Sequence, residues 1–241
     1  MVSSHSMKVS VIIPTYNERG NIKELVAQIF ALGISDLEVI IVDDSSGDGT
    51  TAVVRTLRKR FPVTLILRPK KMGLGSALKD GLSLAVLHGA QIAITMDADF
   101  SHDPAMLKTM IEKSDQGNDL VIGSRRIQGG EIIGWGTMRT LMSRSAMEIS
   151  RRILGIKAHD VTSGFRAYRR RILETVNLSR VSSTGYAFQE EMLYRTQRAG
   201  FNITEIPIIF HDRKHGKSKL GIKDIMEFFW TVIRLKIHLI T

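Results

Sequence analysis

Two hydrophobic periods alternate along the first half of the chain. Short runs rich in β-branched residues predict buried strands at residues 8–14, 37–44, 63–69, 90–97 and 119–124. Apolar residues at helical spacing between these runs predict helices at residues 21–32, 50–60, 73–89 and 104–116. Asn21, with Glu24 three residues later, and Asp103, directly before Pro104, are typical helix-start signals. This half of the chain is therefore expected to repeat a strand–helix unit.

Such alternation predicts an α/β fold with a mostly parallel central sheet between two layers of helices. Ligands of these sheets bind beyond the carboxyl ends of the strands. Polar clusters follow four of the predicted strands, at residues 14–18, 42–50, 97–103 and 123–126. Their convergence at one edge predicts a functional site there.

The second half is less regular. Residues 125–136 contain four glycines and are expected to form a mobile loop, and residues 159–173 a short strand or turn followed by a helix. Other predicted elements are helices at 137–154 and 186–199, a strand at 201–210, and a basic loop at 211–221. We expect a single domain over residues 8–223 and an amphipathic or interfacial helix over 224–241. Residues 1–7 are expected to be an added or disordered leader.

Charge divides the chain more sharply than hydrophobicity does. Residues 1–124 carry 13 Lys/Arg and 14 Asp/Glu, whereas residues 125–241 carry 21 and 10, a balance of +11. Such asymmetry indicates either an anionic partner (nucleic acid, acidic lipid or a phosphorylated substrate) or simply a solvated basic surface. Only 6% of the residues are aromatic, which disfavours single-strand nucleic-acid binding. The absence of cysteine excludes disulfides and thiolate metal sites.

The segment Ile94–Pro104, ITMDADFSHDP, holds the strongest candidate chemistry. Asp97 and Asp99 stand two residues apart at the end of a predicted strand, where both can reach one Mg²⁺ or Mn²⁺ ion. Ser101 offers a hydroxyl ligand, and His102 a ligand or general base. The alternative, that the pair caps the next helix, is weakened because Asp103 already fills that position.

Other candidates surround this pair. Asp43 and Asp44 end the second predicted strand, where carboxylates commonly bind a base or ribose, although an Asx-type turn is a real alternative. Basic residues of the second half would bind phosphates: Arg125, Arg139, Arg144, Arg213, Lys214, Lys217 and Lys219. The glycines of residues 73–81 are expected to serve close packing and a helix start.

The motifs together resemble a known family. VSVIIPTYNE, VIIVDDSSGDGT and ITMDADFSHDP are similar to glycosyltransferase family 2, which has the GT-A fold. VIGSRR, DVTSGFRAYRR, GYAFQEEM and HDRKHGKSKLG resemble the dolichyl-phosphate mannose synthases and related polyprenyl-phosphate glycosyltransferases. The resemblance implies inverting transfer of one sugar, mannose from GDP-mannose, to a dolichyl or polyprenyl monophosphate with a divalent cation.

The resemblance also implies roles for individual residues. The residues expected to contact the nucleotide-sugar are Pro14, Tyr16, Glu18, Ile41, Asp43, Asp44, Asp97, Ala98, Asp99, Gln189, Arg213 and Lys219. The residues expected to bind the acceptor phosphate are Arg125, Arg139 and Ser143. Those expected to bind the metal are Asp97, Asp99 and Ser101. The catalytic residues are expected to be Asp97, Asp99, Arg125, Arg213 and Lys219. Ser101 stands where many members carry Gln. No general base is assigned, because a phosphate is already a nucleophile.

Because the implied acceptor is a lipid, the protein is expected to act at the cytoplasmic face of a membrane. It would bind there peripherally or through an anchoring partner subunit. Residues 228–241 are too short for a membrane span and carry Arg234, Lys236 and His238. Three alternatives stay open: a UDP-sugar-dependent polyprenyl-phosphate glucosyl- or aminosugar transferase, a nucleic-acid-binding protein, and a non-catalytic sugar-nucleotide sensor.

Overall fold

The computed structural model describes residues 7–212 and 222–237 of the 241-residue chain. Nine strands are assigned in this part: β1 (Val9–Thr15), β2 (Leu37–Asp43), β3 (Val63–Leu67), β4 (Ile92–Thr95), β5 (Leu120–Ser124), β6 (Glu131–Ile133), β7 (Arg166–Arg169), β8 (Ile203–Pro207) and β9 (Ile209–His211). The helices are α1 (Arg19–Ala31), α2 (Thr50–Leu57), α3 (Leu74–Leu87), α4 (Met106–Asp115), α5 (Thr137–Leu154), α6 (Arg170–Val176), α7 (Ala187–Arg198) and α8 (Ile222–Ile237), with a 3₁₀ turn at Leu178–Arg180.

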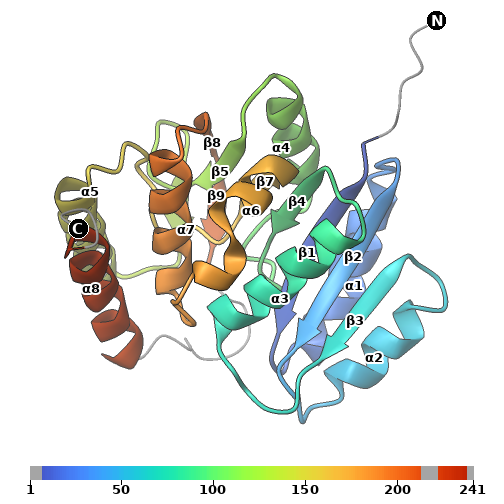
Figure 1. Ribbon diagram of the computed structural model, residues 1–241. Helices are drawn as coiled ribbons and strands as arrows, with labels where there is room; N and C mark the ends of the chain where they lie inside the picture. The colour runs from blue at the N-terminus through green and yellow to red at the C-terminus, as the bar shows by residue number, and fades with distance from the viewer. Residues whose placement is uncertain (1–6, 213–221, 238–241) are drawn as a thin grey trace, which may run out of the picture.

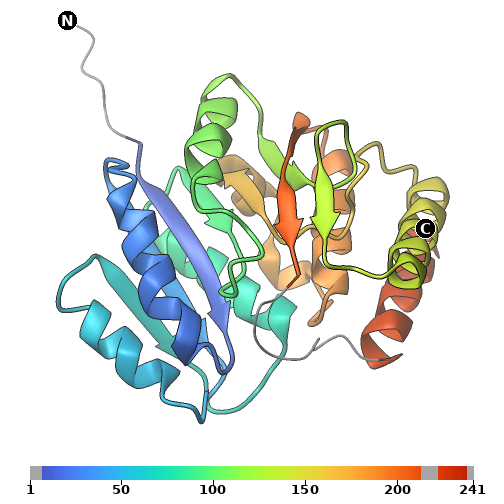
Figure 2. The same ribbon diagram turned by 180° about the vertical axis from the view of Figure 1, so that it is seen from behind.

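Seven strands form one sheet in the order β3-β2-β1-β4-β7-β5-β8. Every pairing is parallel except those of β7, which runs antiparallel between β4 and β5. Helices α1, α2 and α4 pack on one face, and α3, α6 and α7 on the other (Figures 1 and 2). The predicted three-layer α/β architecture is confirmed.

Burial explains why these segments become strands. In β1 and β2 nearly every side chain is buried, as expected where helices cover both faces of a parallel sheet. Gly75 allows α3 to lie directly against the chain before α7, since a Cβ there would stand 2.8 Å from the Gly185 carbonyl oxygen. The packing role predicted for the glycines of residues 73–81 is confirmed.

Some local predictions were wrong. Glu18, not Asn21, immediately precedes α1, and the Asn21 amide donates to the Glu18 carboxylate at 3.0 Å. Helix α4 begins at Met106, and Asp103 instead accepts the Ala105 N–H at 2.9 Å in a preceding turn.

The predicted 125–136 loop contains β6, which pairs in parallel with β9 in a separate two-stranded sheet (Figure 2). The single strand predicted at 201–210 is divided into β8 and β9. Both differences arise because three-residue strands form only when a distant partner pairs with them.

Helices α5 and α8 pack against each other at one end of the molecule, beyond β8 (Figure 1). Both are amphipathic: α8 buries Phe228, Val232 and Leu235 while leaving Trp230 and Ile233 exposed. Among the described helices, none combines the length and hydropathy that crossing a bilayer requires.

Candidate active site

The polar clusters predicted to converge do share one edge of the sheet. Strands β1, β2 and β4 are parallel neighbours, and their carboxyl ends lead into residues 16–18, 44–49 and 96–105. Each of these three loops contains a residue other than glycine with positive φ: Asn17 at 59°, Ser45 at 56° and Phe100 at 61°. Such backbone strain gathers at functional sites, because the surrounding structure must hold it in place.

Asp97 and Asp99 lie in the loop after β4, which ends at Thr95. The left-handed Phe100 turns the chain so that Asp99 accepts the Ser101 N–H at 3.1 Å. The Ser101 hydroxyl is buried and makes no hydrogen bond within the described part of the chain. Two carboxylates and an unpaired hydroxyl are hard oxygen donors of the kind Mg²⁺ and Mn²⁺ prefer.

No group of three His, Cys, Asp or Glu side chains that could hold a metal occurs among the described residues. A cation at Asp97 and Asp99 would therefore complete its coordination with other oxygens, such as those of a substrate phosphate. The residues present fit that kind of partly open magnesium or manganese site.

His102 supports this loop. Its Nδ1 accepts the Asp97 N–H at 3.1 Å, and its ring stacks on Phe165 with centroids 4.9 Å apart. Burial lowers the His102 pKa, against the opposing pull of Asp97 and Asp99. The imidazole is thus neutral, stacked on a ring, and hydrogen-bonded through Nδ1 to the Asp97 backbone N–H. These contacts indicate that His102 positions Asp97, and they disfavour its predicted role as a general base or metal ligand.

The two aspartates that end β2 are both bonded to protein. Asp43 is fully buried and accepts hydrogen bonds from Thr15 Oγ1 (2.8 Å), the Ser46 N–H (2.9 Å) and Ser46 Oγ (2.6 Å). Asp44 forms a buried ion pair with Arg68 and accepts the Gly73 N–H at 3.3 Å. The Asx-type turn considered from the sequence is thus present, and nucleotide binding by this pair stays a prediction.

Other residues predicted for the nucleotide differ in exposure. Pro14, Tyr16 and Glu18 are half-buried at or just beyond the end of β1, and Lys71 Nζ lies 4.6 Å from the centre of the Tyr16 ring. Ile41 and Ala98 belong to the hydrophobic core. The structure therefore does not bring the Ile41 side chain to the edge.

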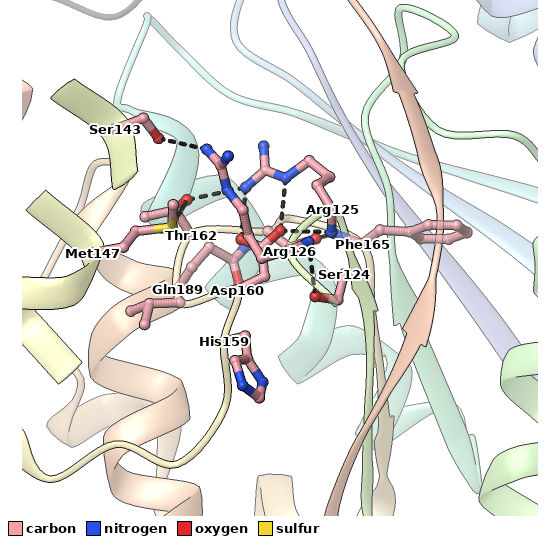
Figure 3. Close-up of polar contacts among 12 residues, drawn as sticks. Ser124, Arg125, Arg126, Ser143, Met147, His159, Asp160, Thr162, Phe165 and Gln189 are labelled. Carbon is pink, nitrogen blue, oxygen red and sulfur yellow. Dashed lines mark hydrogen bonds and ion pairs between the residues drawn. The ribbon is translucent and has the colours of Figure 1, made fainter. Parts of the chain in front are cut away.

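Arg125, at the end of β5, is buried against Asp160 (Figure 3). Its Nε and one terminal nitrogen each donate to the Asp160 carboxylate at 2.7 Å, and its backbone N–H donates at 3.0 Å. Burial raises the pKa of Asp160, but the Arg125 charge and hydrogen bonds outweigh this and lower it to about 2. The Arg125 guanidinium also lies over the Phe210 ring, 5.2 Å from its centre.

The other predicted acceptor residues are on α5. Arg139 is exposed, donates to Asp212 at 3.0 Å and stacks over Trp135 at 4.0 Å. Ser143 Oγ accepts a hydrogen bond from Arg126 at 3.2 Å (Figure 3). Arg213 and Lys219 lie outside the described residues, so their predicted contacts are not placed.

Gln189 approaches Asp97 across Gly164. A Cβ on Gly164 would lie 3.6 Å from Asp97 Oδ1 and 3.8 Å from Gln189 Nε2, and that amide nitrogen is buried with no hydrogen-bond partner among the described residues. Arg166, fully buried, donates to the carbonyl oxygens of Gln189 (2.6 Å), Ser163 (2.8 Å) and Val161 (2.6 Å). It thereby fixes the start of α7 beside the carboxylate loop.

The sequence analysis gave no individual role to Asp160 or Arg166, although both stand in the motif DVTSGFRAYRR that carries the family resemblance.

A family model for "Glycosyl transferase family 2" matches residues 10–176, from β1 through α6. The chain belongs to glycosyltransferase family 2. This family-2 glycosyltransferase is 39% identical over 229 residues to a polyprenol monophosphomannose synthase of Mycolicibacterium smegmatis, covering 94% of this chain and 86% of that protein. It is 38% identical over 216 residues to an undecaprenyl-phosphate mannosyltransferase of Micrococcus luteus, with 89% and 88% covered.

Solved structures agree in fold. The glucosyl-3-phosphoglycerate synthase of Mycobacterium tuberculosis, in complex with Mn²⁺, UDP and glucosyl-3-phosphoglycerate, aligns with a TM-score of 0.69 at 21% identity, covering 95% of this chain and 80% of that one. Its complex with Mg²⁺ and UDP aligns with the same TM-score, covering 95% and 79%. The family-2 glycosyltransferase thus has the predicted GT-A fold.

Proposed function

We propose that this glycosyltransferase transfers one mannose, with inversion, from a nucleotide diphosphate donor to the monophosphate of a polyprenyl lipid. The observation that carries the proposal is the 39% identity, across 94% of the chain, to a polyprenol monophosphomannose synthase. The carboxylate loop and the basic residues beyond β5 are compatible with this reaction, since one binds cations and the other anions.

On the donor side, Asp97, Asp99 and Ser101 would hold a Mg²⁺ or Mn²⁺ ion against the diphosphate. Such an ion supplies charge neutralisation for the departing nucleoside diphosphate. His102 and Phe165 keep the loop in place, and the Gln189 amide nitrogen near Asp97, which has no hydrogen-bond partner among the described residues, would donate to a sugar hydroxyl. Arg213 and Lys219 are proposed to contact the diphosphate from the following basic segment.

On the acceptor side, a phosphate oxygen attacks the anomeric carbon, and the bond from that carbon to the donor phosphate breaks. The acceptor is already ionised, so no side chain has to remove a proton. Catalysis then depends on positioning and on stabilisation of charge. Arg125, held rigidly by Asp160, with Arg139 and Ser143, is proposed to orient the acceptor phosphate.

GDP-mannose is the proposed donor, with its nucleoside between the loop after β1 and the turn at Asp43. The Tyr16 ring, half-buried and beside Lys71, is a suitable surface for the base. A UDP-sugar donor is the second candidate, because the described contacts at Tyr16 and Asp43 do not distinguish guanine from uracil.

A lipid acceptor requires access to a membrane, and we propose peripheral binding at its cytoplasmic face, directly or with a membrane-anchoring partner subunit. Helices α5 and α8 support this, because they lie side by side and expose Met138, Leu141, Trp230 and Ile233. We take residues 8–223 as the catalytic domain and residues 224–241 as part of the membrane-binding element.

A radiolabelled transfer assay tests the proposal. The purified chain is offered GDP-mannose, UDP-glucose or UDP-N-acetylglucosamine in separate reactions, each with a polyprenyl phosphate and Mg²⁺ or Mn²⁺. We expect labelled lipid from GDP-mannose alone, and none when a chelator removes the metal. Product from a UDP-sugar only, or tight UDP binding without GDP binding in titration calorimetry, would favour the second candidate. Donor binding without lipid product from any donor would indicate a sensor.

A further inference from the structure

Phe210 is the central residue of β9, outside the main sheet. β9 pairs with β6 in the separate two-stranded sheet, where Phe210 lies opposite Ile132 (Figure 2). Phe210 and the neighbouring Trp135 are both half-buried. Within the described part of the chain, neither ring belongs to the two hydrophobic clusters that form the core. The position of the Phe210 ring therefore has to be explained by its other contacts.

On one side, Phe210 contacts the carboxylate loop through His102. The two rings meet edge to face, with their centroids 5.7 Å apart and their planes at 67°. His102 also stacks on Phe165 and accepts the Asp97 N–H at 3.1 Å. Edge-to-face contacts between rings are favourable and depend on orientation. Phe210 is thus connected to the Asp97 backbone through one imidazole ring.

On the other side, Phe210 contacts the residues proposed for the acceptor phosphate. The Arg125 guanidinium lies over its ring, 5.2 Å from the centre. Trp135 meets Phe210 edge to face at 6.0 Å between centroids, and the Arg139 guanidinium lies over Trp135 at 4.0 Å. A cation over an aromatic face is attracted to it electrostatically. Both arginines therefore rest on Phe210, one directly and the other through Trp135.

The two groups that Phe210 connects come from different segments. The carboxylate loop follows β4, whereas Arg125 follows β5 and Arg139 belongs to α5. In-line attack requires the acceptor oxygen to lie about 3–3.5 Å from the reacting carbon, and an error of about 1 Å costs about 10²-fold in rate. A rigid ring in contact with both segments limits such errors.

We propose that Phe210 is a positioning residue for sugar transfer, which holds Arg125 and Arg139 at a fixed place relative to the metal-binding loop. This inference rests on the proposed reaction. Because Phe210 acts through other residues, its loss should disturb the alignment of the two substrates and the binding of the acceptor phosphate. The nucleotide, which is proposed to lie near Tyr16 and Asp43, should bind as before.

Three variants test this role. Phe210→Leu removes the ring but stays apolar, and Phe210→Tyr keeps the ring. Phe201→Leu is the matched control, because Phe201 is also half-buried and lies beneath an arginine, Arg171, at 5.9 Å, but it packs on the core before β8. The measurements are steady-state kinetics of lipid labelling, calorimetric titration of GDP or UDP (whichever wild type binds) with Mg²⁺, and a thermal melt.

We expect Phe210→Leu to lower kcat by about 10-fold to 100-fold and to raise the KM for the polyprenyl phosphate by roughly threefold or more. Its affinity for the nucleotide should stay within about twofold of wild type, and its melting temperature within about 2 °C. Phe210→Tyr should keep at least about a third of the wild-type kcat, since the ring contacts remain. Phe201→Leu should transfer at the wild-type rate.

Two results would overturn the positioning role. One is transfer by Phe210→Leu with unchanged kcat and acceptor KM, or with a loss equal to that of Phe210→Tyr. The other is a fall in nucleotide affinity that parallels the fall in kcat, because a general structural defect has that effect. Absence of transfer by wild type would instead overturn the reaction on which the role rests, so the two failures are distinguishable.

Discussion

Two aspartates of one loop, Asp99 and Asp103, make the same local hydrogen bond in different surroundings. Each carboxylate accepts the N–H of the residue two positions later, at 3.1 Å from Ser101 and 2.9 Å from Ala105. Asp99 is 8% exposed and adjoins the unpaired Ser101 hydroxyl, whereas Asp103 is exposed. Comparing the two aspartates therefore separates the local hydrogen bond, which both make, from the metal binding proposed for Asp99 alone.

We predict that Asp99→Asn lowers sugar transfer by about 10²–10³-fold and leaves the melting temperature within about 2 °C of wild type. Asparagine keeps the oxygen that accepts the Ser101 N–H but loses the negative charge that a divalent cation requires. The checks are initial rates of lipid labelling and a thermal melt. Asp103→Asn, the matched control, should transfer at the wild-type rate. Unchanged transfer by Asp99→Asn would contradict the metal assignment.

Arg166 acts through the backbone. Because it is fully buried and donates to three carbonyl oxygens, replacing it with Met keeps most of the volume but removes all three hydrogen bonds. We predict that Arg166→Met lowers the free energy of unfolding by about 3–5 kcal/mol, measured by urea denaturation. Arg170→Met, which removes a half-exposed partner of Glu174, should cost under about 1 kcal/mol. Similar losses in both variants would argue against this role.

The carboxylate pair Asp97 and Asp99, compared with Arg166 and Asp160, shows which individual residues the sequence could predict to be functional and which it could not. Asp97 and Asp99 were recognisable because a hydrophobic run ends at them, which is a local signal. Arg166 and Asp160 were quoted only as part of a family motif, and their roles were not predicted, because those roles depend on partners 23 and 35 residues away, Gln189 and Arg125. An ion pair or a hydrogen bond between residues far apart in the chain does not alter the hydrophobic periodicity from which the elements were predicted.

At the scale of elements, two consecutive glutamates of α7 have opposite surroundings. Burial and the charge of Glu191 raise the pKa of Glu190 to about 8, and the hydrogen bond from Ser150 of α5 only partly offsets this. Burial also acts on Glu191, but hydrogen bonds from Ser183 and Arg195 and the charge of Arg234 outweigh it and lower the Glu191 pKa. Glu190 thus joins α7 to α5 as an uncharged acid, and Glu191 joins α7 to α8 as an anion.

We predict opposite pH dependences for the two glutamine variants. Because the folded Glu190 pKa of about 8 is above its unfolded value near 4.5, wild type loses stability as pH rises between these values. Glu190→Gln escapes this loss, so its advantage over wild type should grow from pH 5 to pH 8, to on the order of 3 kcal/mol. Urea denaturation across that range measures it.

Glu191→Gln is the matched control on the same helix. Its lowered pKa means that the stability it provides is present above about pH 4.5 and is lost as pH falls through the folded pKa. This variant should be less stable than wild type by roughly 3 kcal/mol at pH 7, with the difference shrinking in acid. A Glu190→Gln variant that parallels Glu191→Gln would show that Glu190 is charged in the folded protein.

The elements themselves were predictable to different degrees. Strands β1, β2, β3 and β5 and helices α3 and α5 follow from long periodic runs, and they were placed to within a few residues. The antiparallel insertion of β7 between β4 and β5 was not foreseen, because the sequence of a four-residue strand carries no record of its direction or partners. The same holds for β6 and β9, which exist only as a pair.

At the scale of the whole molecule, the basic half and the exposed apolar helices coincide. Helices α5 and α8, both after residue 125, expose large apolar side chains, namely Met138, Leu141, Met142, Met226, Trp230 and Ile233. Apolar area of this kind on one end of a protein marks an interaction surface. A flanking excess of positive charge favours an anionic membrane as the partner, which agrees with a lipid-linked acceptor.

The last prediction tests this surface through Trp230, which is 63% exposed on α8. Moving an exposed indole into the interface of a bilayer contributes about 1–2 kcal/mol, so Trp230→Gln should weaken binding to vesicles with anionic lipid about tenfold. Leu87→Gln is the matched control, since Leu87 is 79% exposed at the end of α3, away from α5 and α8 (Figure 1). Sedimentation with vesicles measures both variants. Transfer to vesicle-embedded acceptor should fall with binding, while transfer to a detergent-dispersed acceptor stays at the wild-type rate, because Trp230 lies outside the carboxyl edge of the sheet. Equal vesicle binding by the two variants would place the membrane-binding surface elsewhere on the molecule.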